Sequence, residues 1–197
     1  MQICISLTTN AEQVQRLKAL QAMFAQACNA LMQVVQQTRI WNRVALHHLA
    51  YKDLRAQFPA LGSQMICNAI YSVARTCRLL FQHPGSPFNL TRRSDKPLPQ
   101  VRFDATCPVY FDRHTLSLRA GQISMLTLDG RMRFQLALKP EDEACFHTLK
   151  LREVVLRRAT VDTFDLIFSL SQADEAATPA LPDSADIPQY LLIEETP

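Results

Sequence analysis

The hydrophobic period of this chain changes along its length, and that change is the strongest constraint on its fold. Residues 9–83 repeat apolar side chains at helical spacing, whereas residues 101–172 alternate apolar and polar side chains, as half-buried strands do. One alternating stretch, residues 1–8, precedes the helical part. Because a single short strand is not stable by itself, we expect it to pair with the later strands. The pattern therefore predicts an α+β fold in which a helical unit is inserted into a sheet.

Three helices are predicted in the helical part. Thr9 and Glu12 have the spacing of a capping box, which indicates that the first helix starts beside them and runs to about residue 37. A proline and a glycine separate the second helix, about residues 43–57, from the third, about residues 63–82. Residues 84–100 then hold four prolines and three basic side chains without any hydrophobic period, which is typical of a linker.

About seven short strands are expected in residues 101–172, and such a number of short strands favours a small barrel or sandwich. Asp129-Gly130 lies between two alternating runs and predicts a hairpin. The last pair of strands is expected to turn near Val161 and Asp162. Residues 173–197 are predicted to be a mostly disordered acidic tail, with QYLLIEETP at its end as a candidate for one more strand.

The formal charge is divided sharply between the body and the tail. Residues 1–158 contain 21 Lys and Arg against 10 Asp and Glu, whereas residues 159–197 contain 8 acids and no Lys or Arg. The resulting charges of +11 and −8 combine to the net +3 of the chain. A basic body of this kind is typical of a protein that binds a polyanion. A solvated surface with a disordered tail would have the same charges, so both interpretations stay open.

The third helix carries two regular stripes of side chains. Because an α-helix turns about 100° per residue, the two stripes lie on opposite faces. The apolar stripe is expected to pack on the first two helices, and the polar stripe to face solvent or a ligand. The polar stripe contains no acid, and amide, guanidinium and phenol groups can contact bases or phosphates. The polar stripe is Gln64, Asn68, Tyr71, Arg75 and Arg78, and the apolar stripe is Ile66, Ile70, Val73, Cys77 and Leu80.

A basic and aromatic cluster lies between the first two helices. Trp41 follows Arg39 and precedes Arg43, so the cluster could stack on a base and bind a phosphate. The alternative is a tryptophan that fills the junction between the two helices.

Four segments follow one another over about residues 1–170: TTNAEQVQRLKALQAMFAQACNAL, WNRVALHHLAYKDLRAQFPALGSQMICNAIYSVARTC, FDRHTLSL and MLTLDGRMRFQLAL. In their order and spacing they resemble the N-terminal half of the TnpB (OrfB) family of transposon-encoded RNA-guided nucleases, which are related to the type V CRISPR effectors. The most specific parts of the resemblance are LRAQFP…SQM…AI and FDRHTLSL…LTLDGR.

The resemblance implies an oligonucleotide-binding-like wedge β-barrel with an inserted three-helix recognition bundle. Residues 1–8 would be the first wedge strand, 9–83 the recognition domain and 101–172 the rest of the wedge. The expected partners are a guide-type RNA and double-stranded DNA. By position, Trp41 would lie near the target-motif duplex and Gln64 would read a base. The candidate nucleic-acid-binding residues are Trp41, Arg43, Gln64, Asn68, Tyr71, Arg75, Arg78, Arg92, Arg93, Lys96 and Arg102.

The family's ribonuclease-H-like nuclease domain and its zinc ribbon have no counterpart in this sequence. The run Glu141-Asp142-Glu143 is expected to be a loop, so no catalytic residues, metal site or cofactor are predicted. We therefore expect a binding module rather than an enzyme. One alternative is a subunit of a split nuclease whose catalytic domain lies on another chain. The other is a protein-interaction domain whose acidic tail folds over its own basic face.

The cellular location is predicted from what the sequence lacks. No apolar run approaches the about 20 residues of a membrane span, and the N-terminus has no signal-peptide pattern. The six cysteines are far apart and include no CxxC pair, so they are expected to be reduced, buried thiols. A cytoplasmic protein without a membrane partner is expected.

Overall fold

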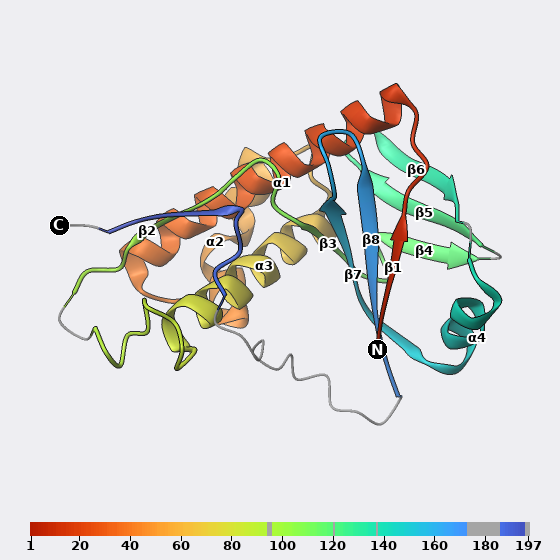
Figure 1. The fold of residues 1–197 in the computed structure, drawn as a ribbon. Coiled ribbons are helices and arrows are strands. Elements are labelled where there is room, and N and C mark those ends of the chain that lie inside the picture. The colour runs from red at the N-terminus through yellow and green to blue at the C-terminus, as the bar shows by residue number, and fades with distance from the viewer. Residues whose placement is uncertain (94–95, 120, 137, 173–185, 196–197) are drawn as a thin grey trace.

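The computed structural model describes residues 1–93, 96–119, 121–136, 138–172 and 186–195 (Figure 1). It has a mixed α+β fold, as predicted. The helices are α1 (Ala11–Thr38), α2 (Arg43–Gln57), α3 (Ser63–Gln82) and α4 (Pro140–Thr148). The strands are β1 (Gln2–Ser6), β2 (Gln100–Phe103), β3 (Val109–Phe111), β4 (Leu116–Arg119), β5 (Gln122–Thr127), β6 (Gly130–Gln135), β7 (Lys150–Arg158), β8 (Phe164–Ser171) and β9 (Leu191–Glu194).

The first strand pairs with a strand that lies more than 150 residues later in the chain. β1 runs antiparallel to β8, with Ile3 opposite Phe168 and Ile5 opposite Leu166. β8 continues to β7 and β3, so the main sheet has the order β1-β8-β7-β3. The prediction that the helices are inserted between the first strand and its partners is therefore confirmed.

The remaining described strands form two smaller sheets. β4, β5 and β6 make an antiparallel meander, and β2 pairs antiparallel with β9. Across the described residues, no ladder of hydrogen bonds closes these three sheets into a barrel, so the structure bears out the α+β class but no closed barrel. In Figure 1, α1 runs along the top of the molecule, past both the main sheet and the β4–β6 meander.

Amide side chains on α1 hold the segment that contains β2. The three amides lie about two turns apart on one helix face, and each donates a hydrogen bond to a backbone carbonyl. The amides thus give hydrogen-bond partners to one carbonyl at the end of β2 and to two carbonyls that flank the strand. The pairs, in order along α1, are Gln21 with Cys107, Asn29 with Phe103 and Gln36 with Pro99.

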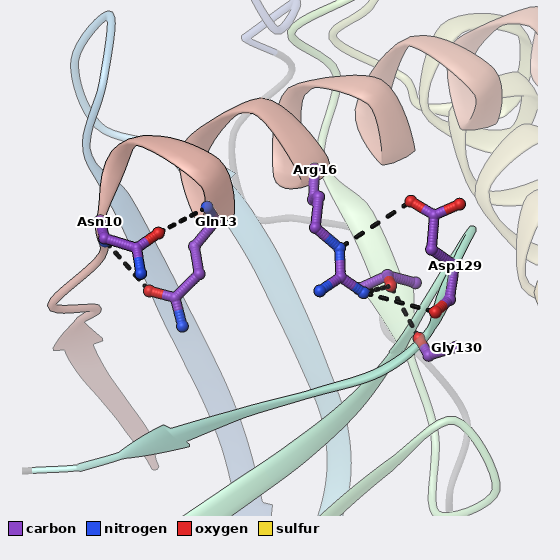
Figure 2. Close-up of polar contacts among 6 residues, drawn as sticks. Asn10, Gln13, Arg16, Asp129 and Gly130 are labelled. Carbon is purple, nitrogen blue, oxygen red and sulfur yellow. Dashed lines mark hydrogen bonds and ion pairs between the residues drawn. The ribbon is translucent and has the colours of Figure 1, made fainter.

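The N-cap of α1 lies one residue later than predicted. The side chain of Asn10 accepts a hydrogen bond from the Gln13 backbone N–H at 2.8 Å, and the Gln13 side chain accepts one from the Asn10 N–H at 3.0 Å (Figure 2). These reciprocal bonds form the capping box, so the predicted pair of Thr9 and Glu12 is wrong. Asparagine is at least as good an N-cap as threonine, and both spacings satisfy the sequence pattern.

Replacing Asn10 with alanine is expected to lower the free energy of unfolding by about 1 kcal/mol, since an orphan N–H loses its acceptor. Urea denaturation followed by circular dichroism measures this change. Thr9→Ala is the matched control and should have a smaller effect. A larger effect for Thr9→Ala would contradict the observed cap.

Arg16 connects α1 to the β5–β6 hairpin. Its guanidinium donates to Thr127 Oγ1 at 3.1 Å and lies 3.8 Å from Asp129 Oδ2 (Figure 2). The predicted hairpin is confirmed, but its two-residue turn is Leu128–Asp129. Gly130 is the first residue of β6, and its φ of 93° explains why a glycine stands there.

One segment that was expected to be a loop forms a helix, and one candidate strand is confirmed. The acidic run at Glu141 occupies the first turn of α4, where Pro140 starts the helix and carboxylates favour its positive end. β9 lies within QYLLIEETP, the candidate strand at the end of the predicted tail, and it pairs with β2. The rest of that tail, residues 173–185 and 196–197, lies outside the described residues.

Candidate nucleic-acid interface

The third helix lies between the other two long helices and the main sheet. Its apolar stripe is buried, and α3 contacts both α1 and α2, as predicted. The opposite side of α3 contacts β3. The helix is therefore covered on two sides, and this placement decides what the polar stripe can do.

The first half of the polar stripe is not a solvent-facing surface, which corrects the prediction. Asn68 is buried, and its amide donates to the Tyr110 carbonyl at 2.9 Å. Gln64 donates to the carboxylate of Asp112. Both amides therefore bind the segment around β3 and join the helical unit to the sheet.

Arg75 and Tyr71 continue this internal contact. Arg75 Nη1 lies 3.2 Å from Glu153 Oε1 on β7, and the Tyr71 ring packs edge-on to Tyr110 at 5.5 Å. Burial by itself lowers the pKa of Arg75, but Tyr110 and Glu153 raise it above its ordinary value, so the guanidinium stays charged. Burial raises the pKa of Tyr71, and Glu153 raises it further. The charge of Arg75 is thus neutralised within the molecule.

The last residue of the polar stripe and the cluster between the first two helices differ in exposure. Arg78 is half-buried, and within the described part of the chain its guanidinium has no acidic partner. Trp41 packs against Phe81 with ring centroids 5.3 Å apart, which supports the interpretation that it fills the helix junction. Arg43 is exposed, and its guanidinium lies 5.3 Å from the centroid of the Tyr71 ring.

The predicted basic residues near the linker form a second group. Arg92, Lys96 and Arg102 are exposed and have no carboxylate partner among the described residues. Arg93 instead pairs with Glu195 at 3.1 Å, and its guanidinium lies over the Phe88 ring. A shallow pocket of about 230 Å³ between α1 and β2 is bordered by Ala22, Ala25, Gln26, Asn29, Arg102 and Leu192.

The structure also brings together cations that the candidate set did not include. Arg119, Arg131 and Arg133 lie on the outward face of the β4–β6 meander. Arg113 is exposed in the turn that precedes β4. In the sequence, Arg131 and Arg133 alternate with the apolar Met132 and Phe134. This period of two places the two arginines on one face of the strand.

The described residues contain no group of three His, Cys, Asp or Glu side chains that could hold a metal ion. All six cysteines are free, but only Cys28, Cys77 and Cys107 are buried, whereas Cys4 is exposed. Burial raises the pKa of Cys107 to about 12, which makes this thiol a poor nucleophile. Of the helices in the described part of the chain, none has the length and hydropathy to cross a membrane.

A comparison with known proteins finds neither a matching family model nor a matching curated protein. The TnpB (OrfB) resemblance therefore stays a prediction from the sequence segments that carry it. A functional proposal for this chain therefore rests on which of its Lys and Arg side chains are exposed and which are paired with a carboxylate.

Proposed function

We propose that the chain is a nucleic-acid-binding module similar to the RNA-scaffold and target-motif-binding half of a TnpB-like effector. It binds RNA and double-stranded DNA through their phosphates and performs no cleavage itself. Its wedge would consist of the main sheet and the β4–β6 meander, and its recognition unit of α1, α2 and α3. A cytoplasmic location and a guide-type RNA partner belong to the same proposal.

The observation that carries this proposal is that no described carboxylate neutralises most of the candidate cations. Arg43, Arg92 and Arg102 are exposed, and no described carboxylate lies within ion-pair distance of them. An exposed cation that has no acidic partner keeps its charge available for a phosphate. Lys96 is another exposed cation of this kind, and Arg78, which is half-buried, likewise has no acidic partner among the described residues.

The topology supports the wedge interpretation. The resemblance implies a strand, an inserted helical unit and then the remaining strands of one sheet. β1 pairs with β8 across the whole helical insertion, and Gln64 and Asn68 bind the helical unit to the β3 segment. The two parts therefore form one continuous body in which the helices and the sheet can contact the same ligand.

One contact favours the second interpretation, a domain whose acidic end covers its own basic face. Glu195 lies 3.1 Å from Arg93, and β9 holds this end of the chain on β2. Intramolecular pairing of this kind competes with phosphate at Arg93. A single ion pair leaves Arg92, Lys96 and Arg102 without a carboxylate partner among the described residues, so nucleic-acid binding is favoured.

The combined variant Arg92→Gln, Lys96→Gln, Arg102→Gln is expected to bind RNA about tenfold more weakly, because each lost phosphate contact reduces the release of counterions. Fluorescence anisotropy with a labelled RNA at about 50 to 200 mM salt measures the affinity and its salt dependence. The slope of log K against log salt should fall by about 2.

The matched control is Lys52→Gln, Lys139→Gln, Lys150→Gln, which removes the same charge from exposed positions elsewhere. It should change the affinity by less than about threefold, since distant exposed charges are largely screened. If the wild-type chain binds neither RNA nor DNA at the lowest salt, the proposed function is wrong.

A further inference from the structure

Most side chains on the outward face of the β4–β6 meander are polar. The apolar exception in these strands is Leu126, which lies opposite Arg131 and close to Gly62. The strands alternate between a buried apolar face, which includes Ile123, Met125 and Phe134, and an outward face. The antiparallel register aligns the outward side chains in rows across the three strands. One row is Arg119, Gln122 and Gln135, and the next is Ser117, Ser124 and Arg133.

This face is positively charged and has no acid of its own. The three strands read LSLR, QISMLT and GRMRFQ, and they contain three arginines and no Asp or Glu. None of these arginines forms an ion pair with a carboxylate in the described ranges. On the main sheet, by contrast, Arg157 pairs with Asp165 at 2.9 Å. The meander arginines therefore keep their charge with respect to the described acids, whereas Asp165 neutralises Arg157.

Backbone carbonyls orient one of the arginines without neutralising it. Arg131 donates through Nη1 to the Ser124 carbonyl at 2.9 Å and through Nη2 to the His114 carbonyl at 3.0 Å. A guanidinium has five N–H donors, so others remain for an incoming anion. A cation that is already held in position loses less entropy when it binds.

The meander is anchored to the rest of the molecule. Its buried face belongs to the common hydrophobic core, and Arg16 of α1 binds its β5–β6 turn (Figure 2). Cα atoms two residues apart on a strand are separated by about 7 Å, so the backbone sets the spacing at which Arg131 and Arg133 leave β6. The regular spacing of these strand positions suits a ligand with regularly spaced anionic groups.

We propose that this face, through Arg119, Arg131 and Arg133, binds the phosphodiester backbone of a nucleic-acid duplex. The inference deepens the proposed function and rests on it. The outward rows of this face contain arginine, glutamine, serine and one leucine, Leu126, and no aromatic ring, so the face offers no stacking platform for the bases of a single strand. Guanidinium, amide and hydroxyl groups are suited to phosphate oxygens. The occupant is therefore a paired helix contacted along its backbone.

The test is the variant Arg119→Gln, Arg133→Gln in the full chain, which leaves the structural bonds of Arg131 intact. Anisotropy is measured with a labelled RNA duplex, a DNA duplex and a single-stranded RNA, each of about 20 nucleotides per strand. Binding of at least one duplex should weaken about tenfold, and its salt slope should fall by about 2. The duplex that loses more affinity identifies whether the ligand is RNA or DNA.

The matched control is Lys52→Gln, Lys150→Gln, which removes the same charge from exposed positions outside the meander. Thermal unfolding should be unchanged in both variants, because both alter exposed side chains. Wild-type affinity of Arg119→Gln, Arg133→Gln for both duplexes would overturn the inference, and so would a loss confined to single-stranded RNA. In either case the proposed function stands if the wild-type chain still binds nucleic acid.

Discussion

Replacing Phe168 with alanine is expected to lower the free energy of unfolding by about 3–5 kcal/mol, the usual effect of removing a fully buried aromatic ring. Phe168 lies at the centre of the main sheet on β8, between Ile3 of β1 and Val154 of β7. Its side chain is fully buried, and its ring packs edge-on to Phe146 of α4 at 5.1 Å. The substitution therefore removes contacts to both neighbouring strands and to the helix.

The measurement is equilibrium urea denaturation, with fluorescence of the single tryptophan and circular dichroism as probes. Ile167→Ala is the matched control, because Ile167 is adjacent on β8 but points to the opposite, half-exposed face. It should lower the free energy of unfolding by about 1 kcal/mol. Equal effects at the two positions would contradict the assigned faces of β8.

Replacing Asn68 with alanine is expected to lower the free energy of unfolding by about 2–4 kcal/mol, since the Tyr110 carbonyl loses its buried donor and a cavity remains. The effect should appear as reduced stability and not as a loss of nucleic-acid affinity. This outcome follows from the position of Asn68 inside the contact between α3 and the main sheet. Replacing a base-reading residue would instead lower the nucleic-acid affinity and leave the stability nearly unchanged.

Urea denaturation measures the stability, and anisotropy with RNA at a temperature where the variant is folded measures the affinity. Gln82→Ala is the control on the same helix, because Gln82 is exposed in its last turn, and it should change stability by less than about 0.5 kcal/mol. Unchanged stability with weaker RNA binding at Asn68→Ala would restore the predicted role of the polar stripe.

The helix boundaries were predictable because they depend on local signals. The bounds of α2 and α3 agree with the prediction, and α1 ends at Thr38 beside the expected residue. Helical period, proline and glycine act within a few residues, so they can be read without the fold. The shifted cap at Asn10 shows the limit of this approach, because two overlapping pairs have the same capping pattern.

The prediction that the polar stripe faces solvent or a ligand is wrong for Asn68 and Arg75, and the reason is physical. Its partners are distant in the sequence: Tyr110 lies 42 residues from Asn68, and Glu153 lies 78 residues from Arg75. An amide that binds a buried carbonyl and an amide that binds a base have the same composition and the same spacing. Only the tertiary contact separates them.

The arginines on the meander also show that a sequence pattern does not reveal neighbours from other strands. Alternation along β6 placed Arg131 and Arg133 on one face, but it could not show that Arg119 from β4 lies on that face too. It also could not show which arginines have a carboxylate nearby. Ion pairing depends on distance in space, whereas a sequence pattern gives only the spacing along one strand or helix.

From the amino-acid order alone follow the α+β class, the three long helices, the β5–β6 hairpin and the return of the first strand to a later sheet. These features depend on local periodicity and on the instability of an isolated strand. The tertiary structure alone decided that Asn68 and Arg75 join α3 to the sheet, whereas Arg119, Arg131 and Arg133 remain exposed and unpaired with the described acids. The difference arises because burial and charge neutralisation are properties of neighbours in space, and distant segments supply those neighbours.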